Sequence, residues 1–227
     1  MIERPGVVGS VCPLRPDRSV VNGIAYDDAD ALLASVDELA AIYDAAGIEA
    51  WTVWVPEGDE HVGEALGAAG HRLDGVPRQM GVALGGLDLE PRFELDLDPA
   101  PAWKDVAEVN EAAYFESAGG AYFGPSLSGL EGRAYVARLD GRPASTLVIF
   151  DVGEDAYVGL VATRKEAQRR GLAGEVLRQA LREARERGRT STTLEATAAG
   201  APVYARLGYG DLGVVQMWER RKSNESA

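Results

Sequence analysis

Apolar side chains recur every three or four residues in three stretches of the chain, which is the spacing of one face of a helix. The first stretch follows Asp27 and Asp28, whose short side chains suit a helix N-cap, and it stops at Gly47. The second covers residues 103–114, and the third runs over residues 171–188. Three amphipathic helices are therefore predicted at these places.

Short runs rich in β-branched and aromatic residues separate these helices and predict strands. The predicted strands cover residues 50–55, 76–84, 93–97, 133–139, 144–150, 157–162, 192–196 and 214–218. Asp140 and Gly141 suit a tight primed turn, so the strands on either side of them should pair as a hairpin. Asp59 should cap a short helix that ends at Gly70, and a second short helix is expected over residues 202–207.

Turn residues and acidic charge interrupt the hydrophobic pattern between Gly85 and Pro91, which is typical of a domain boundary. We therefore predict an N-terminal α/β region over residues 1–88 and a larger domain over residues 89–220. The remaining residues, 221–227, are expected to be a disordered tail.

A faint internal repeat links the two predicted regions. Residues 52–82 and residues 193–218 share the order strand, short helix, strand, and in this alignment Leu66 takes the place of Tyr204. The repeat reflects either an ancient duplication or a chance similarity between two alanine-rich segments.

Composition narrows the class of protein. The 227-residue chain is 46% apolar and 26% charged, which is the balance of a globular protein. Its longest apolar runs fall short of the ~20 residues of a membrane-spanning helix, and charged residues near the N-terminus interrupt any signal peptide. A single cysteine, Cys12, cannot form an internal disulfide. We expect a cytoplasmic protein with no membrane partner.

The charge pattern excludes some partners and suggests others. A net charge of −13 argues against nucleic-acid binding, because phosphates would be repelled. His61 and His71 lack the spacing of metal ligands, so we interpret both as surface or loop residues and expect no metal. Basic residues nevertheless crowd the stretch 164–189. They are either a solvated helix face or a surface that meets an anionic cofactor.

The junction between the strand at 157–162 and the helix at 171–188 carries the motif Gln168-Arg169-Arg170-Gly171-Leu172-Ala173. Free backbone N–H groups and the helix dipole favour an anion at a helix N-terminus. A glycine there lets the backbone approach the ligand closely, and arginines beside it can add charge-assisted contacts to phosphates. The motif predicts a site for a diphosphate, which we call the cradle.

The cradle motif and the downstream segment Pro202-Val203-Tyr204-Ala205-Arg206-Leu207-Gly208-Tyr209 together resemble the GNAT family of N-acetyltransferases, in which the two motifs occur in this order. The resemblance covers about residues 93–219. It implies a mixed, mostly antiparallel twisted sheet flanked by helices, which opens between the strands at 157–162 and 192–196. The smaller N-terminal α/β half is then a candidate degenerate GNAT-like repeat, packed on the active half and shaping its acceptor pocket.

The resemblance also implies a cofactor and its contacts. Acetyl-CoA would supply the acyl group, with backbone groups on the strand at 157–162 holding its pantetheine and cradle amides holding its diphosphate. The implied cofactor-binding residues are Leu160, Val161, Gln168, Arg169, Arg170, Gly171, Leu172, Ala173 and Gly174.

Tyr204 matches the family position that protonates the departing thiolate, although a packed aromatic residue is the alternative reading. Glu195 is the first candidate for the general base and Glu116 the second. Either could instead be a solvated carboxylate, with a water chain removing the proton. Further residues would build the acceptor pocket, unless the aromatic ones belong to the core: Tyr114, Phe115, Glu116, Tyr122 and Phe123.

The sequence departs from the family pattern at one position and leaves more than one function open. An asparagine that often precedes the Tyr204 position in the family is replaced here by residues 197–199, Thr-Ala-Ala, which puts one cofactor contact in doubt. The function is either transfer of an acetyl group to an amine of a small molecule or peptide, or acyl-CoA binding by a catalytically silent regulatory module. An interaction protein without a ligand is a third reading. Dimers are common in the family, so a homodimer is a candidate assembly.

Overall fold

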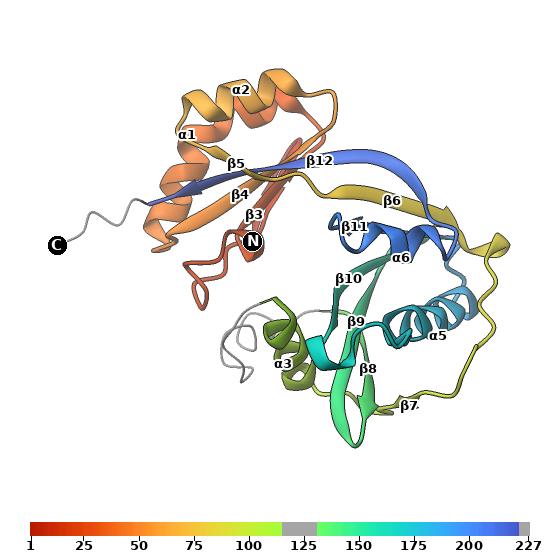
Figure 1. Cartoon of the computed structure of the whole chain (residues 1–227). Helices are drawn as coiled ribbons and strands as arrows, with labels where there is room; N and C mark the ends of the chain where they lie inside the picture. The colour runs from red at the N-terminus through yellow and green to blue at the C-terminus, as the bar shows by residue number, and fades with distance from the viewer. Residues whose placement is uncertain (115–130, 223–227) are drawn as a thin grey trace. The chain divides into compact units, whose positions relative to one another are not determined.

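The computed structural model describes residues 1–114 and 131–222 (Figure 1). Backbone contacts divide the chain into two compact units. Unit 1 contains Met1–Pro77 together with the C-terminal segment that begins at Gly213, and unit 2 contains Arg78–Leu212. Unit 1 is therefore built from both ends of the chain.

Unit 1 is a sheet with two helices. Its elements are β1 (Ile2–Arg4), β2 (Val7–Gly9), η1 (Ser19–Val21), β3 (Gly23–Tyr26), α1 (Ala29–Ala45), β4 (Ala50–Pro56), α2 (Glu60–Ala68), β5 (Arg72–Gly75) and the later part of β12 (Gly210–Arg221). The β1, β2 and β3 strands form an antiparallel meander, β3 runs parallel to β4, and β12 pairs antiparallel with both β4 and β5.

The predicted first helix is confirmed by α1. Asp28 is its N-cap and accepts a hydrogen bond from the Ala31 N–H at 3.0 Å, which satisfies one of the free amides of the first turn. Gly47 takes a left-handed conformation with φ 71° just beyond the helix, where a residue with a side chain would be strained. Leu32, Leu39 and Tyr43 are buried along one face and form the core of unit 1.

Unit 2 is the larger sheet. Its elements are β6 (Arg78–Ala83), η2 (Leu84–Gly86), β7 (Asp96–Leu97), α3 (Trp103–Tyr114), β8 (Arg133–Leu139), β9 (Arg142–Val152), β10 (Asp155–Thr163), η3 (Lys165–Ala167), α5 (Leu172–Glu186), β11 (Ser191–Ala196) and α6 (Ala201–Ala205). The strand order is β6-β11-β10-β9-β8-β7, and every pair is antiparallel except β10 with β11. The predicted mixed, mostly antiparallel sheet flanked by helices is confirmed.

Two helices cover opposite faces of the unit 2 sheet (Figure 1). On β9, Leu147 packs in the cluster that contains α5, whereas its neighbour Val148 packs with α3. Successive side chains of a strand point to opposite faces, so this strand, in which residues 144–149 are all buried, is covered on both sides. The hairpin turn between β8 and β9 lies at Asp140 and Gly141, both with positive φ, as the sequence predicts.

The last strand of the N-terminal region (residues 1–88), β6, belongs to unit 2, and the last strand of the C-terminal half, β12, pairs within unit 1. The β6 strand lies in the N-terminal half of the chain but pairs with β11 over six positions, from Ala83 opposite Ser191 to Arg78 opposite Ala196. Conversely, β12 pairs with β4 in unit 1. The units therefore do not coincide with the predicted ranges 1–88 and 89–220. The described strand β12 also runs into the predicted tail, while residues 223–227 lie outside the described residues.

Two predicted strands differ from the observed ones. Residues 76–84 contain β6 alone, which begins after Pro77, and a separate β5 precedes it. Only Asp96 and Leu97 of the predicted strand at 93–97 pair, as β7. The residues before them run along α5 instead, where the Arg92 N–H donates to the Glu175 carboxylate at 2.9 Å.

Removing residues 1–88 is expected to unfold unit 2. The deletion takes away β6, with buried Met80, and also Leu84, which is fully buried in the same core as α5. Losing one large buried side chain costs about 2–5 kcal/mol, and the exposed edge of β11 invites aggregation. We expect the product to be insoluble, or to show a molten state by circular dichroism. The matched control is the truncation that removes only residues 1–77 and keeps β6. A folded 89–227 fragment that melts cooperatively would contradict this topology.

His71 lies in the loop between α2 and β5, as one of the two interpretations has it, but it is buried there, so the surface interpretation was wrong. Only 3% of it is exposed, and its ring packs edge-on against Trp51 with 4.6 Å between centroids. Its Nδ1 lies 3.2 Å from the Leu66 carbonyl oxygen. Burial, opposed in part by this contact and reinforced by the Arg220 charge, lowers the pKa of His71 to about 4. The ring is therefore neutral in the folded state at pH 7.

Acidification is expected to destabilise unit 1 through His71. The imidazole has a pKa near 6.5 when unfolded and about 4 when folded, so its stabilising contribution is complete above pH 6.5 and is lost as the pH falls towards 4. The loss amounts to roughly 3 kcal/mol at most, at about 1.4 kcal/mol per pKa unit. Thermal melting between pH 7 and pH 4.5 measures it. His71→Phe should flatten the slope and the exposed control His61→Phe should not; equal slopes in both variants would refute this account.

Candidate functional site

The unit 2 sheet opens between β10 and β11. These two parallel strands pair over three positions only, from Asp155 with Ser191 to Tyr157 with Thr193. Beyond that point β10 continues to Thr163 and β11 to Ala196 without pairing with each other. We call the space bordered by residues 158–163 and 194–196 the split. It lies where the sequence resemblance implies that the sheet should open.

One wall of the split contains a backbone irregularity. The register of β10 against β9 shifts between Gly159 and Ala162, so that Leu160 and Val161 together oppose one residue of β9. Leu160 has a φ of +51°, which is uncommon for a residue with a side chain. The two backbone positions that the sequence analysis selected for cofactor binding therefore form a bulge.

The cradle connects β10 to α5. Arg169 and Gly171 both have positive φ, at 61° and 80°, and Gly171 is the N-cap of α5 without a side chain to cap it. The amides of the first helical turn, at residues 172–174, have no partner inside the helix. Gln168, Arg169 and Arg170 are exposed beside them, and the Gln168 Nε2 donates to the Thr163 carbonyl at 3.1 Å. The local geometry suits an anion.

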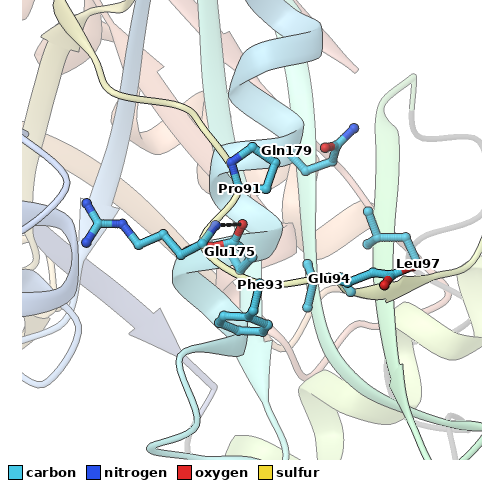
Figure 2. Close-up of a pocket in the computed structure, with 8 residues that line it drawn as sticks. Pro91, Phe93, Glu94, Leu97, Glu175 and Gln179 are labelled. Carbon is cyan, nitrogen blue, oxygen red and sulfur yellow. Dashed lines mark hydrogen bonds between the residues drawn. The ribbon is translucent and has the colours of Figure 1, made fainter.

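Gly171 is required by both its conformation and its surroundings. A Cβ atom at this position would lie 3.3 Å from Cε1 of Phe93, in addition to the strain of φ 80°. Phe93 also lines a pocket of about 460 Å³ (Figure 2). That pocket lies between residues 91–97 and the α5 side chains Glu175 and Gln179, and none of the predicted site residues lines it.

Tyr204 is a buried phenol at the end of α6. Only 8% of it is exposed, and its ring packs edge-to-face on Tyr209 with centroids 5.9 Å apart. Burial, and to a smaller extent the nearby Tyr114, raises the pKa of Tyr204 well above its usual range. The phenol is therefore protonated at neutral pH and can donate a proton, but it cannot act as a base.

Glu195 belongs to the same group of side chains. Its carboxylate accepts a hydrogen bond of 2.5 Å from the Tyr157 hydroxyl. Burial and then the Glu195 charge raise the pKa of Tyr157, and Tyr204 adds to this effect, so the three groups lie close together. Sequence reasoning did not select Tyr157, because its contact with Glu195 depends on the parallel register of β10 and β11, which no local pattern shows.

The acceptor residues are only partly within the described structure. Tyr114 ends α3 and is 58% exposed, and its hydroxyl donates to the Val161 carbonyl at 2.9 Å. It therefore lies at the bulge. The other four candidates, Phe115, Glu116, Tyr122 and Phe123, lie outside the described residues.

Residues 1–114 and 131–222 contain neither a cluster of metal-binding side chains nor a membrane-spanning helix. In these ranges no three side chains of His, Cys, Asp or Glu gather in a way that could hold a metal ion. The helices of the same ranges include none that is both long and apolar enough to cross a membrane.

Comparison with known proteins identifies the family. Residues 98–209, which contain the split, the cradle and Tyr204, match the acetyltransferase (GNAT) family. The chain belongs to this family through that domain, and the class of enzyme that the family defines is an acyltransferase. The family generally uses acetyl-CoA and acts on amine acceptors. Among curated proteins, none matches the chain by sequence.

Solved structures show the same fold along the whole chain. A GCN5-related N-acetyltransferase from Kribbella flavida is 18% identical with a TM-score of 0.73, covering 99% of this chain and 90% of its own. A functionally unknown conserved protein from Staphylococcus epidermidis is 14% identical with a TM-score of 0.71, covering 98% and 94%. A tandem GNAT protein from the clavulanic acid biosynthesis pathway is 15% identical with a TM-score of 0.60, covering 90% and 76%. These likenesses concern the fold.

Proposed function

We propose that this protein is an acetyl-CoA-dependent N-acetyltransferase that moves an acetyl group to an amine of a small molecule or peptide. The observation that carries the proposal is the meeting of three features in unit 2: an open split, an exposed helix N-terminus beside it, and a protonated buried tyrosine. The split would admit the pantetheine arm, the helix N-terminus would hold the diphosphate, and the tyrosine would protonate the departing thiolate.

The residues along the split fit acetyl-CoA. The amides of the cradle and the guanidinium groups of Arg169 and Arg170 would hold the diphosphate, because a left-handed glycine at the N-cap leaves those amides open to it. Backbone groups of Leu160 and Val161 would hold the pantetheine arm in place of the strand partner that β10 lacks there. Bound in this way, acetyl-CoA supplies an activated acyl group as a thioester.

Tyr204 is proposed as the general acid. The amine nitrogen attacks the thioester carbonyl carbon, the C–S bond breaks, and the sulfur takes the proton of the Tyr204 hydroxyl. A tyrosine with the ordinary pKa of about 10 is already protonated at neutral pH, and the burial that raises the pKa of Tyr204 leaves it protonated. Glu195, held by Tyr157, is the candidate that accepts the proton lost by the amine, either directly or through water. Much of the rate would come from holding the amine and the thioester together.

The acidic surface favours cationic acceptors. A net charge of −13 attracts polyamines, aminoglycosides and basic peptides over a long range and repels nucleic acids. We place the protein in the cytoplasm, with no metal in the reaction, and regard a homodimer as the first assembly to test. Acceptor residues 114–116 and 122–123 would select among such amines.

The N-terminal half is proposed to be a degenerate GNAT-like repeat that supports the active half. The β4, α2 and β6 elements follow the same strand, short helix, strand order as β11, α6 and β12, with β5 as an additional strand before β6, and each copy contributes its last strand to the other unit. Leu66, at the position that corresponds to Tyr204, is fully buried in the core of unit 1. Its side chain has no acidic group that could protonate a thiolate.

Release of free CoA tests the proposal directly. The full chain would be mixed with acetyl-CoA and a panel of polyamines, aminoglycosides and basic peptides, with thiol appearance followed in time and products checked by mass spectrometry. Amine-dependent thiol release with an acetylated product supports transfer. Saturable acetyl-CoA binding without turnover on any amine would instead favour the alternative, a catalytically silent acyl-CoA-binding regulatory module.

A further inference from the structure

Asn110 is a buried amide on α3 that the proposed chemistry does not use. Only 3% of the residue is exposed. Its Nδ2 lies within hydrogen-bond distance of three oxygens: the Val106 carbonyl of its own helix at 2.9 Å, the Thr146 hydroxyl at 3.3 Å and the Leu160 carbonyl at 3.2 Å. One side chain thus joins α3, β9 and the bulge of β10.

Tyr114 lies one helical turn beyond Asn110 and contacts the next residue of the bulge. Residues four apart lie on the same face of a helix, and here both reach the same segment. Asn110 donates to the Leu160 carbonyl, and Tyr114 donates to the Val161 carbonyl at 2.9 Å. The Thr146 hydroxyl also lies 3.5 Å from the Leu160 oxygen. Two successive carbonyl groups of the bulge are therefore held from the side of α3.

The hydrogen bonds to the Leu160 carbonyl determine the direction in which the Val161 N–H points. In a trans peptide the C=O of one residue and the N–H of the next point in opposite directions. Because the Leu160 carbonyl is held toward α3 and β9, the Val161 N–H must point away from them. The other edge of β10 in this region faces the split. A left-handed Leu160 is also unfavourable by itself, so it persists only because its surroundings hold it.

We propose that Asn110, supported by Tyr114, is a positioning residue that directs the Val161 N–H into the split, where it donates to a carbonyl oxygen of the acyl-CoA. This inference rests on the proposed function. A donor is needed at Asn110: a carboxylate would repel the Leu160 carbonyl, and an apolar side chain would remove the amide donor from that buried oxygen.

Asn110→Asp in the full chain tests the inference, with affinity for acetyl-CoA measured by titration calorimetry. The change keeps the shape of the side chain but removes both N–H groups, and we expect binding to weaken by about tenfold, the order of one lost hydrogen bond. Asn22→Asp is the matched control. Asn22 is equally buried, and its Nδ2 donates to the Arg15 and Arg18 carbonyls at 2.9 and 2.8 Å in unit 1. It should lower the melting temperature without changing affinity beyond about twofold.

A second variant keeps the test decisive if Asn110→Asp does not fold. Tyr114→Phe removes one exposed hydroxyl and should weaken acetyl-CoA binding by about threefold, the lower range for a hydrogen bond, with little effect on melting. Unchanged affinity in these variants, or an equal loss in Asn22→Asp, would overturn the inference while leaving the proposed function standing. A wild-type chain that does not bind acetyl-CoA would overturn the proposed function and the inference together.

Discussion

Gly171→Glu is expected to abolish acetyl-CoA binding, with affinity falling by about a hundredfold or more. The left-handed conformation of Gly171 strains any side chain by about 1–2 kcal/mol, and its Cβ would press on Phe93. The new carboxylate would also stand at the helix N-terminus, where the cradle is proposed to hold a diphosphate. Titration calorimetry of the variant against acetyl-CoA measures the loss.

Gly188→Glu is the matched control for this experiment. Gly188 follows the other end of α5, is exposed, and has a φ of 86° with no atom within 4 Å of the position of its Cβ. The substitution therefore has the same backbone strain and the same added charge, but it lies far from the cradle. It should bind acetyl-CoA like the wild type. If the two variants bound equally well, the cradle would not be the diphosphate site.

Tyr204→Phe is expected to lower turnover by about a hundredfold while leaving acetyl-CoA affinity nearly unchanged, because general acid catalysis contributes about 10²–10⁴-fold. The variant keeps the buried ring and removes only the hydroxyl group, and with it the proton that the phenol would donate. The measurement is the initial rate of thiol release with an amine found in the acceptor panel, together with calorimetric affinity.

Tyr209→Phe provides the comparison for Tyr204. Tyr209 is buried beside Tyr204, and its hydroxyl lies 2.8 Å from the Thr192 hydroxyl. Each of the two variants removes one phenol hydroxyl from this group of buried side chains, so an effect of packing should appear in both. Turnover lost equally in both, or retained in Tyr204→Phe, would remove Tyr204 from the role of acid.

Local patterns were sufficient to predict the parts of the molecule that depend on near neighbours in sequence. The apolar spacing and Asp28 cap of α1, the Asp140-Gly141 hairpin and the start of α5 directly after Gly171 all lie where they were predicted. In each of them the decisive interaction joins residues at most a few positions apart. The order of strands and helices then allowed the family to be suspected, and the family match confirms it.

Features that depend on distant pairing could not be predicted. The pairing of β6 with β11 and of β12 with β4 joins residues more than one hundred positions apart. The hydrophobic pattern of a strand does not specify which other strand it will pair with. The contacts of Tyr157 with Glu195 and of Asn110 with Leu160 likewise require the register of the sheet. The burial of His71 was not predicted, because its ring packs on Trp51, which is twenty residues away.

Calorimetric titration of the purified full chain with acetyl-CoA, and with CoA beside it, measures whether unit 2 binds the proposed acyl donor. We expect saturable binding at one site, lost in Gly171→Glu and kept in Gly188→Glu. If a folded chain bound neither ligand, the proposed function would be wrong, because the enzyme and the silent acyl-CoA-binding module both require this binding.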